Sequence, residues 1–271
     1  YFNTKLYTGD GGTQSVTGVG FQPDWTWIKN RGSTDSHNVY DAVRGVTKYL
    51  LTNNTVAEGT TSGVTAFNSD GFSVGNNSMT NSNSNNYASW NWKAGTSASG
   101  ATTGSGTAKT FSSSSNSESG FSIVKYVGNG TSNHAIPHGC GTAPKMIIVK
   151  TTTKASQAWP VDCRQVGGIL YLNTTQSTDS YGDTSPFTSV APTSSVFSIG
   201  SPGNVNYNND TYIAYCFAEK QGYSKFGSYT GNGSTDGTFV YTGFKPAFVI
   251  IKITSGTGNW NIFDIKRDGY N

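Results

Sequence analysis

Three stretches of this chain share one pattern of polar and apolar positions. Each has a glycine, a proline three residues later, and then a run of large apolar side chains closed by lysine: residues 20–29, 141–150 and 243–252. A proline is tolerated at the first position of a strand because its missing N–H is not needed there. Alternate residues of a strand point to opposite faces, and in the last two runs both sets are apolar. We therefore predict three central strands, with Trp27 and Ile148 buried.

Further strands and turns flank each run. Asp10-Gly11, Asn129-Gly130 and Asn232-Gly233 are typical hairpin turns, and they carry too few carboxylates for a calcium loop. The strands Tyr87–Trp92 and Tyr212–Phe217 alternate, with their aromatic side chains on one face. Such aromatic residues could stack on sugar rings, but in a chain this poor in leucine we interpret them as the core.

These signals predict an all-β fold of tandem antiparallel β-sandwich repeats, jelly-roll or lectin-like, with little helix. The first repeat covers residues 1–95 and the second 119–222, and a Gly/Ser/Thr-rich linker joins them over residues 96–118. Residues 223–271 begin a third repeat. We therefore expect the chain to be a fragment of a longer protein.

Composition narrows the classes of function. Charged residues make up 12% of the chain, against about 25% in ordinary domains, and the net charge of +3 is too small to indicate nucleic-acid binding. No apolar run approaches the roughly 18 residues of a membrane helix, so we predict no membrane partner. The three cysteines form no C-x-x-C pair, which gives no reason to expect a metal or a cofactor.

An aspartate follows each of the three prolines at the same distance: Asp41, Asp162 and Asp264. Arg44 and Arg267 come three residues after their aspartates, whereas the second repeat has Gln165 at that place, directly after Arg164. The pair could bind a sugar or could hold a turn by charge-assisted hydrogen bonds. We favour the structural role, since the second repeat departs from the pattern.

Catalysis has little support in the sequence. A glycosidase needs two carboxylates roughly 5 to 10 Å apart, and the acidic residues that fall near loops form no evident pair: Asp41, Asp70, Asp179 and Asp183. Pro137 lies between His134 and His138 and excludes a helical metal face. We predict that the protein is not an enzyme, and a polysaccharide depolymerase is the weaker alternative.

A glycan ligand, in contrast, would suit three loops rich in Asn, Ser, Thr and Tyr: residues 76–86, 176–186 and 204–209. Their amides and hydroxyls offer the paired donors and acceptors that sugar hydroxyls require. Tyr181 and Tyr207 could supply a stacking face and Asn204 an amide. The alternative is that these loops are only solvated.

Three segments carry a resemblance to a known family: Gly18–Arg31, Tyr212–Glu219 and Lys225–Tyr270. They are similar to the repeat domains of bacteriophage tail-fibre and virion appendage proteins, of the type found in marine phages. The resemblance implies a virion or extracellular location and a homo-oligomer, commonly a trimer. It also implies other virion proteins and bacterial surface polysaccharide as partners, and no active residues. An extracellular filament or adhesin of a cell is the alternative.

Overall fold

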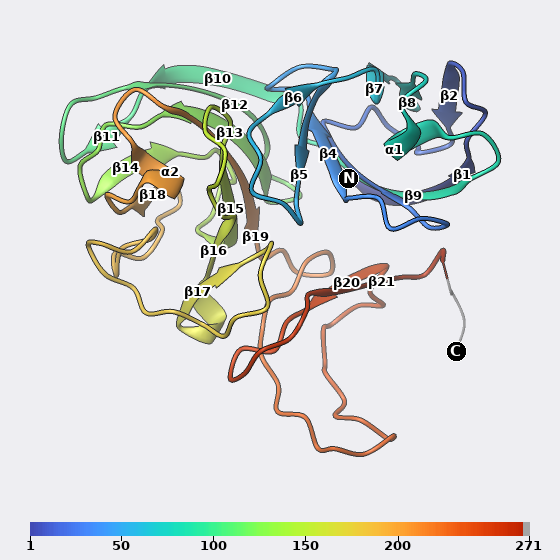
Figure 1. Cartoon of the computed structure of the whole chain (residues 1–271). Coiled ribbons are helices and arrows are strands. Elements are labelled where there is room, and N and C mark those ends of the chain that lie inside the picture. Colours follow the sequence, from blue (N-terminus) through green and yellow to red (C-terminus); the bar gives the residue numbers. More distant parts are fainter. Residues whose placement is uncertain (268–271) are drawn as a thin grey trace.

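The computed structural model describes residues 1–267, which form an all-β fold of antiparallel sheets with very little helix (Figure 1). The elements of the first unit, residues 1–95, are β1 (Phe2–Thr8), β2 (Gln14–Thr17), β3 (Trp25–Asn30), β4 (Asn38–Asp41), β5 (Lys48–Leu51), β6 (Gly59–Thr60), β7 (Val64–Asn68), β8 (Gly71–Val74), α1 (Ser78–Asn81) and β9 (Asn86–Trp92). They form a six-stranded sheet of order β1-β9-β3-β4-β5-β6 and a three-stranded sheet of order β2-β8-β7.

The second unit, residues 96–222, has a similar arrangement. Its elements are β10 (Thr96–Ala101), β11 (Thr103–Gly104), β12 (Thr110–Asn116), β13 (Phe121–Val127), β14 (His134–Pro137), β15 (Pro144–Thr151), β16 (Pro160–Cys163), a 3₁₀ turn (Arg164–Val166), β17 (Gly168–Tyr171), β18 (Val196–Ile199), α2 (Gly203–Asn206) and β19 (Thr211–Ala218). The large sheet has the order β10-β12-β13-β19-β15-β16-β17, and the small sheet the order β11-β14-β18. In both units the closing strand, β9 or β19, therefore lies beside the central strand, β3 or β15.

Each small sheet covers one face of its large sheet. Val16 and Phe72 from the first small sheet pack with Ile28 of β3, and all three are at most 3% exposed. In the second unit Phe197 and Ile199 pack in the same way with Ile147 of β15. The sandwich architecture predicted from alternating apolar positions is confirmed.

Residues 96–118 correct the prediction of a linker. β10 pairs with β12 over its whole length, and β12 pairs with β13, so this segment extends the edge of the second large sheet. The Ser, Ala and Gly residues of β10 bury little surface, since every residue of this strand is exposed. Backbone hydrogen bonds within the hairpin hold it instead, which composition alone does not reveal.

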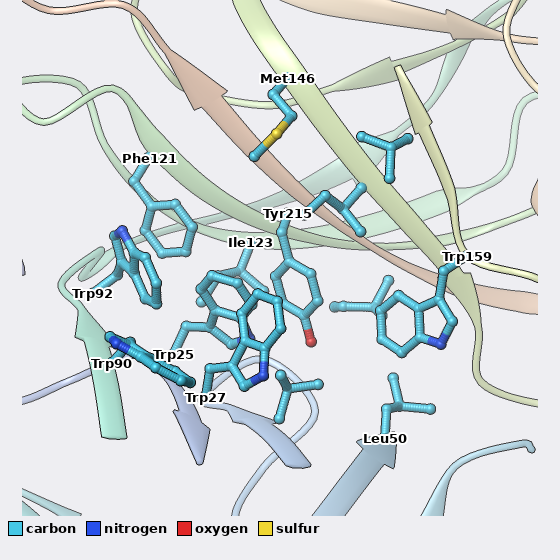
Figure 2. Close-up of a cluster of buried hydrophobic side chains, with 14 of the residues drawn as sticks. Trp25, Trp27, Leu50, Trp90, Trp92, Phe121, Ile123, Met146, Trp159 and Tyr215 are labelled. Carbon is cyan, nitrogen blue, oxygen red and sulfur yellow. The ribbon is translucent and has the colours of Figure 1, made fainter. Parts of the chain in front are cut away.

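The other faces of the two large sheets meet in a core that both units share (Figure 2). Trp25 of β3 stacks on Tyr215 of β19, with ring centroids 4.5 Å apart. Trp27 is 3% exposed and Ile148 is 2% exposed, which confirms that both lie in central strands. This shared aromatic core explains why few aliphatic residues suffice, since each aromatic ring buries a large apolar area.

A third segment, residues 223–267, supplies the hairpin of β20 (Phe248–Ile251) and β21 (Asn261–Asp264). Phe248, Ile250 and Ile262 pack against the shared core. Figure 1 shows this hairpin below the first unit and at about the height of β17 of the second unit. Residues 268–271 of the predicted third repeat lie outside the described part of the chain.

The strand register of the second central hairpin differs from that of the other two, so Asp162 is placed differently from Asp41 and Asp264. Trp25 pairs with Asp41 and Phe248 pairs with Asp264, whereas Met146 pairs with Cys163. The loop before β16, residues 152–159, is one residue longer than the loop before β4, residues 31–37. A shift of one residue moves a side chain to the opposite face of a sheet. Asp162 therefore faces the interior of the second unit, although the aspartates are equally spaced in sequence.

Candidate functional site

The turns at one end of each unit are held by a buried asparagine. Asn81 at the end of α1 donates to the carbonyls of Gly12 and Gly75, and its Oδ1 accepts from the N–H of Asp10. Asn206 at the end of α2 donates to the carbonyls of Thr131 and Gly200, and its Oδ1 accepts from the N–H of Asn129. These amides fix the two Gly-rich turns against the short helices.

A buried tyrosine of the closing strand, β9 or β19, hydrogen-bonds to each helix. The hydroxyl of Tyr87 donates to the Ser78 carbonyl and accepts from the N–H of Ser82. The hydroxyl of Tyr212 donates to the Gly203 carbonyl and accepts from the N–H of Tyr207. Ser82 and Tyr207 therefore occupy corresponding places on two similar supports. Burial raises the pKa of Tyr212, which keeps the hydroxyl protonated as a donor.

The exposed side chains on these supports differ. Tyr207 is 47% exposed and stands where the first unit has Ser82. The Nζ of Lys154 lies 4.0 Å from the centroid of the Tyr207 ring and 3.0 Å from a carboxylate oxygen of Asp210. Asp210 corresponds to Asn85, since the carbonyls of both residues accept from the first glycine of the adjacent turn. We call Tyr207, Lys154 and Asp210 the Tyr207 cluster.

Two further contacts shape this cluster. A Cβ at Gly203 would lie 1.9 Å from Cε2 of Tyr207, so only glycine lets the ring lie against α2. The Nζ of Lys109, from the loop between β11 and β12, donates to Oδ1 of Asn209 at 2.7 Å. The surface thus combines an aromatic ring, two ammonium groups, a carboxylate and an amide. Such a set can stack on a sugar ring and hydrogen-bond its hydroxyl or acidic groups.

The other two predicted glycan residues have different surroundings. The hydroxyl of Tyr181 donates to Asp162 at 2.8 Å, and the guanidinium of Arg164 lies 4.2 Å from the centre of its ring. One face of that ring is therefore occupied within the protein. Asn204 lies in α2, and its Oδ1 is buried without a hydrogen-bond partner among residues 1–267. Of the two candidate tyrosines, Tyr207 is exposed and Tyr181 is half-buried.

The Asp/Arg pairs lie inside the protein. Asp41 and Arg44 form an ion pair in which the side chains are 0% and 1% exposed. Asp264 and Arg267 pair in the same way, and Nε1 of Trp90 donates to Asp264 at 3.0 Å. The Asp41 carboxylate accepts from the hydroxyl of Tyr215 in the second unit at 2.8 Å. Asp41 thus joins two units through a buried hydrogen bond and Asp264 through a partly buried one, and Asp41 is inaccessible to a ligand.

Other groups with reactive chemistry have structural contacts. The Asp70 carboxylate accepts from the N–H groups of Gly18 and Gly20, which lowers its pKa. The thiol of Cys140 lies 3.8 Å from the Cys216 carbonyl, and both residues are fully buried. No cluster of three or more His, Cys, Asp or Glu residues that could hold a metal occurs in residues 1–267. The helices of this described region are also too short and too polar to span a bilayer.

Sequence reasoning missed Lys154 and Asp210, which complete the site around Tyr207. A signal was present, because the two units can be aligned position by position. Asp210 aligns with Asn85, and the exposed Tyr207 aligns with Ser82. Because loops carry function as well as sequence variation, such exposed differences show where to look for a site that one unit has and the other lacks.

Comparison with known proteins identifies a family. The model of a domain of unknown function, DUF7483, matches residues 1–271. The chain belongs to the DUF7483 family. No curated protein and no solved structure matches it.

Proposed function

We propose that this DUF7483 chain is a structural and adhesive module of a phage tail fibre or other virion appendage, and that it contacts bacterial surface glycan through the Tyr207 cluster. The observation that carries the adhesive part is the exposed Tyr207 on a support whose counterpart in the first unit holds Ser82. The extensive buried contacts between the units support the structural part, because they make one rigid body of several sheets.

The charges of the cluster favour an acidic glycan. Lys109 and Lys154 bring two ammonium groups to this surface, whereas Asp210 brings one carboxylate. An exposed ammonium–aromatic contact is worth only about 0.5 to 1 kcal/mol, so Lys154 can leave the ring when a sugar stacks there. A uronic acid could then take the place of Asp210 as the partner of Lys154.

A glycan array that includes neutral and uronic-acid polysaccharides tests this function. We expect binding to acidic glycans, reduced at least 10-fold by Tyr207→Ser, which introduces the residue type of the first unit, and by Lys154→Ala. Tyr181→Phe should bind normally and serves as the matched control. Undiminished binding by Tyr207→Ser, with unfolding midpoints unchanged, would remove the cluster from the site.

The virion location rests on the resemblance of Gly18–Arg31 and Tyr212–Glu219 to phage appendage repeats. A filament or adhesin on a cell surface is the second candidate, since the same modules would serve it. Antibody labelling of purified particles in the electron microscope distinguishes the two. Label along a fibre of a phage particle would support the first, and label only on cellular filaments would overturn it.

Self-association is part of the same proposal, with a trimer as the expected form of a fibre. The support is apolar surface on the third segment, where Phe239 is 85% exposed and Phe263 is 57% exposed. Sedimentation analysis of the protein should give a single oligomer. A monodisperse monomer in that experiment would exclude this form of assembly.

A further inference from the structure

The central hairpin of the third segment differs from its counterparts in having one strand neighbour fewer. β3 lies between β4 and β9, and β15 lies between β16 and β19. β20 pairs with β21 on one edge, and no strand of residues 1–267 pairs with its other edge. An unpaired strand edge presents N–H and C=O groups that can bind another extended chain.

The β20–β21 hairpin is covered on one face only. Phe248 and Ile250 pack on the shared core, as Met146 and Ile148 do. On the opposite face Val249 is 37% exposed, although its counterpart in β15, Ile147, is 1% exposed. The open edge therefore adjoins the shared core on one face and bare apolar surface on the other.

We propose that the open edge of β20 is a docking site for an antiparallel strand with aromatic residues at alternate positions. The strands that pair with the corresponding edges of β3 and β15 define that chemistry. Trp90 and Trp92 of β9 face Trp27 and Trp25, and Tyr215 and Phe217 of β19 face Ile148 and Met146. A third such strand would place its two aromatic side chains beside Ile250 and Phe248, and would continue the shared core without a break.

The contacts between units predict which aromatic residue this strand carries. Tyr215 of the second unit donates to Asp41 of the first, and Trp90 of the first donates to Asp264 of the third segment. If this pattern of contacts continues around the shared core, the docking strand contacts the second unit. Cys163 stands there in place of an aspartate, because it pairs with Met146 as Asp41 pairs with Trp25.

Cys163 packs against the shared core, and burial raises its pKa to about 11, so its thiol stays neutral. A neutral thiol is a weak acceptor. A buried Tyr or Trp donor without an acceptor is unfavourable, so the docking strand is expected to carry phenylalanine at the place of Tyr215 and Trp90.

Labelled peptides that copy residues 211–218, with Cys216→Ser for stability and lysine tails for solubility, test this site on the full chain. Fluorescence anisotropy gives affinity, and hydrogen exchange gives the location. We expect binding that protects residues 248–251, equal or tighter binding for the Tyr215→Phe peptide, and a loss of more than 10-fold for the Tyr215→Ser/Phe217→Ser peptide. Of two peptides N-methylated at alternate residues, only one should bind, because a strand bonds through one edge.

Three results would overturn the proposal. The first is equal binding of the Ser-substituted and parent peptides. The second is protection confined to strands other than β20. The third is a dimer in the absence of peptide with residues 248–251 protected, which would make a second copy of the chain the occupant. None of these outcomes bears on glycan binding, so this inference and the proposed function can fail separately.

Discussion

Asp41 of the first unit and Asp162 of the second are both buried aspartates on the second strand of a central hairpin, but they face opposite sides of their sheets. Asp41 meets Tyr215 across the shared core, together with the fully buried Arg44. Asp162 meets Tyr181 and the partly exposed Arg164 of its own unit.

The comparison shows that loop length determines on which face of its sheet a recurring aspartate lies. The one-residue difference between loops 31–37 and 152–159 exchanges an aspartate for Cys163 at the shared core. The first unit is thereby joined to the second by the hydrogen bond from Tyr215 to the Asp41 carboxylate. In the second unit the aspartate contacts residues of its own unit, and the neutral Cys163 lies at the shared core.

The largest effect is expected in the shared core itself. Trp27→Ala should lower the free energy of unfolding by about 3 to 5 kcal/mol and Ile148→Ala by about 2 to 5 kcal/mol. Because both units contribute to this core, each variant should also speed hydrogen exchange in β9 and β19 together. Urea unfolding with Tyr241→Ala, at a residue 79% exposed, as control measures this. A loss below about 0.5 kcal/mol for Trp27→Ala would remove that residue from the core.

Exchange of the two aspartates for asparagine should separate their roles. Asp41→Asn leaves the Arg44 guanidinium, 1% exposed, with Glu58, 3.3 Å away and 18% exposed, as its remaining carboxylate partner, and should cost about 3 kcal/mol. Asp162→Asn should cost about 1 kcal/mol, since Arg164 is 16% exposed and water can solvate it. Equal losses in chemical denaturation would show that the face on which the aspartate lies does not matter.

Acid should destabilise the protein through His37. His37 accepts a hydrogen bond from Nε1 of Trp27, and burial, followed by the charges of Lys29 and Arg267, lowers its pKa to about 4. Between pH 6.5 and 4 the unfolded chain then binds more protons than the folded one, so stability falls as the pH falls.

The loss from this histidine should reach about 3 kcal/mol at pH 4. Unfolding free energies measured from pH 7 to 4 for the wild type and His37→Gln test this, because the glutamine retains an acceptor but does not titrate. Burial also lowers the pKa of His134, so some acid sensitivity should persist in the variant. Identical pH profiles would exclude His37 as a source.

Removal of a single hydroxyl should also distinguish the two aspartate sites, with the smallest loss at Tyr181. Tyr215→Phe removes a fully buried donor to Asp41 and should cost about 1.5 kcal/mol, as for hydrogen bonds to charged groups. Tyr181→Phe removes the corresponding donor to Asp162, at a half-buried ring, and should cost less than about 1 kcal/mol. Thermal unfolding of the two variants side by side measures the difference. A larger loss for Tyr181→Phe would reverse the comparison.

The sequence by itself determined the fold class and the central strands. A run of large apolar residues that follows a proline predicts a central strand, so Trp27 and Ile148 could be placed in the core from their neighbours alone. Glycine-rich turns and the near absence of long apolar helical patterns likewise predicted an all-β chain. These features are local, and each depends on a few adjacent residues.

Tertiary structure decided which surface each of those strands meets. The pairing of β10 with β12, the opposite orientations of Asp41 and Asp162, and the meeting of Lys154 with Tyr207 all join residues that are distant in sequence or depend on exact register. Alternation tells which side chains share a face, but not what covers that face. A single inserted residue inverts the assignment, so only the packed sheets could show which aspartate links two units.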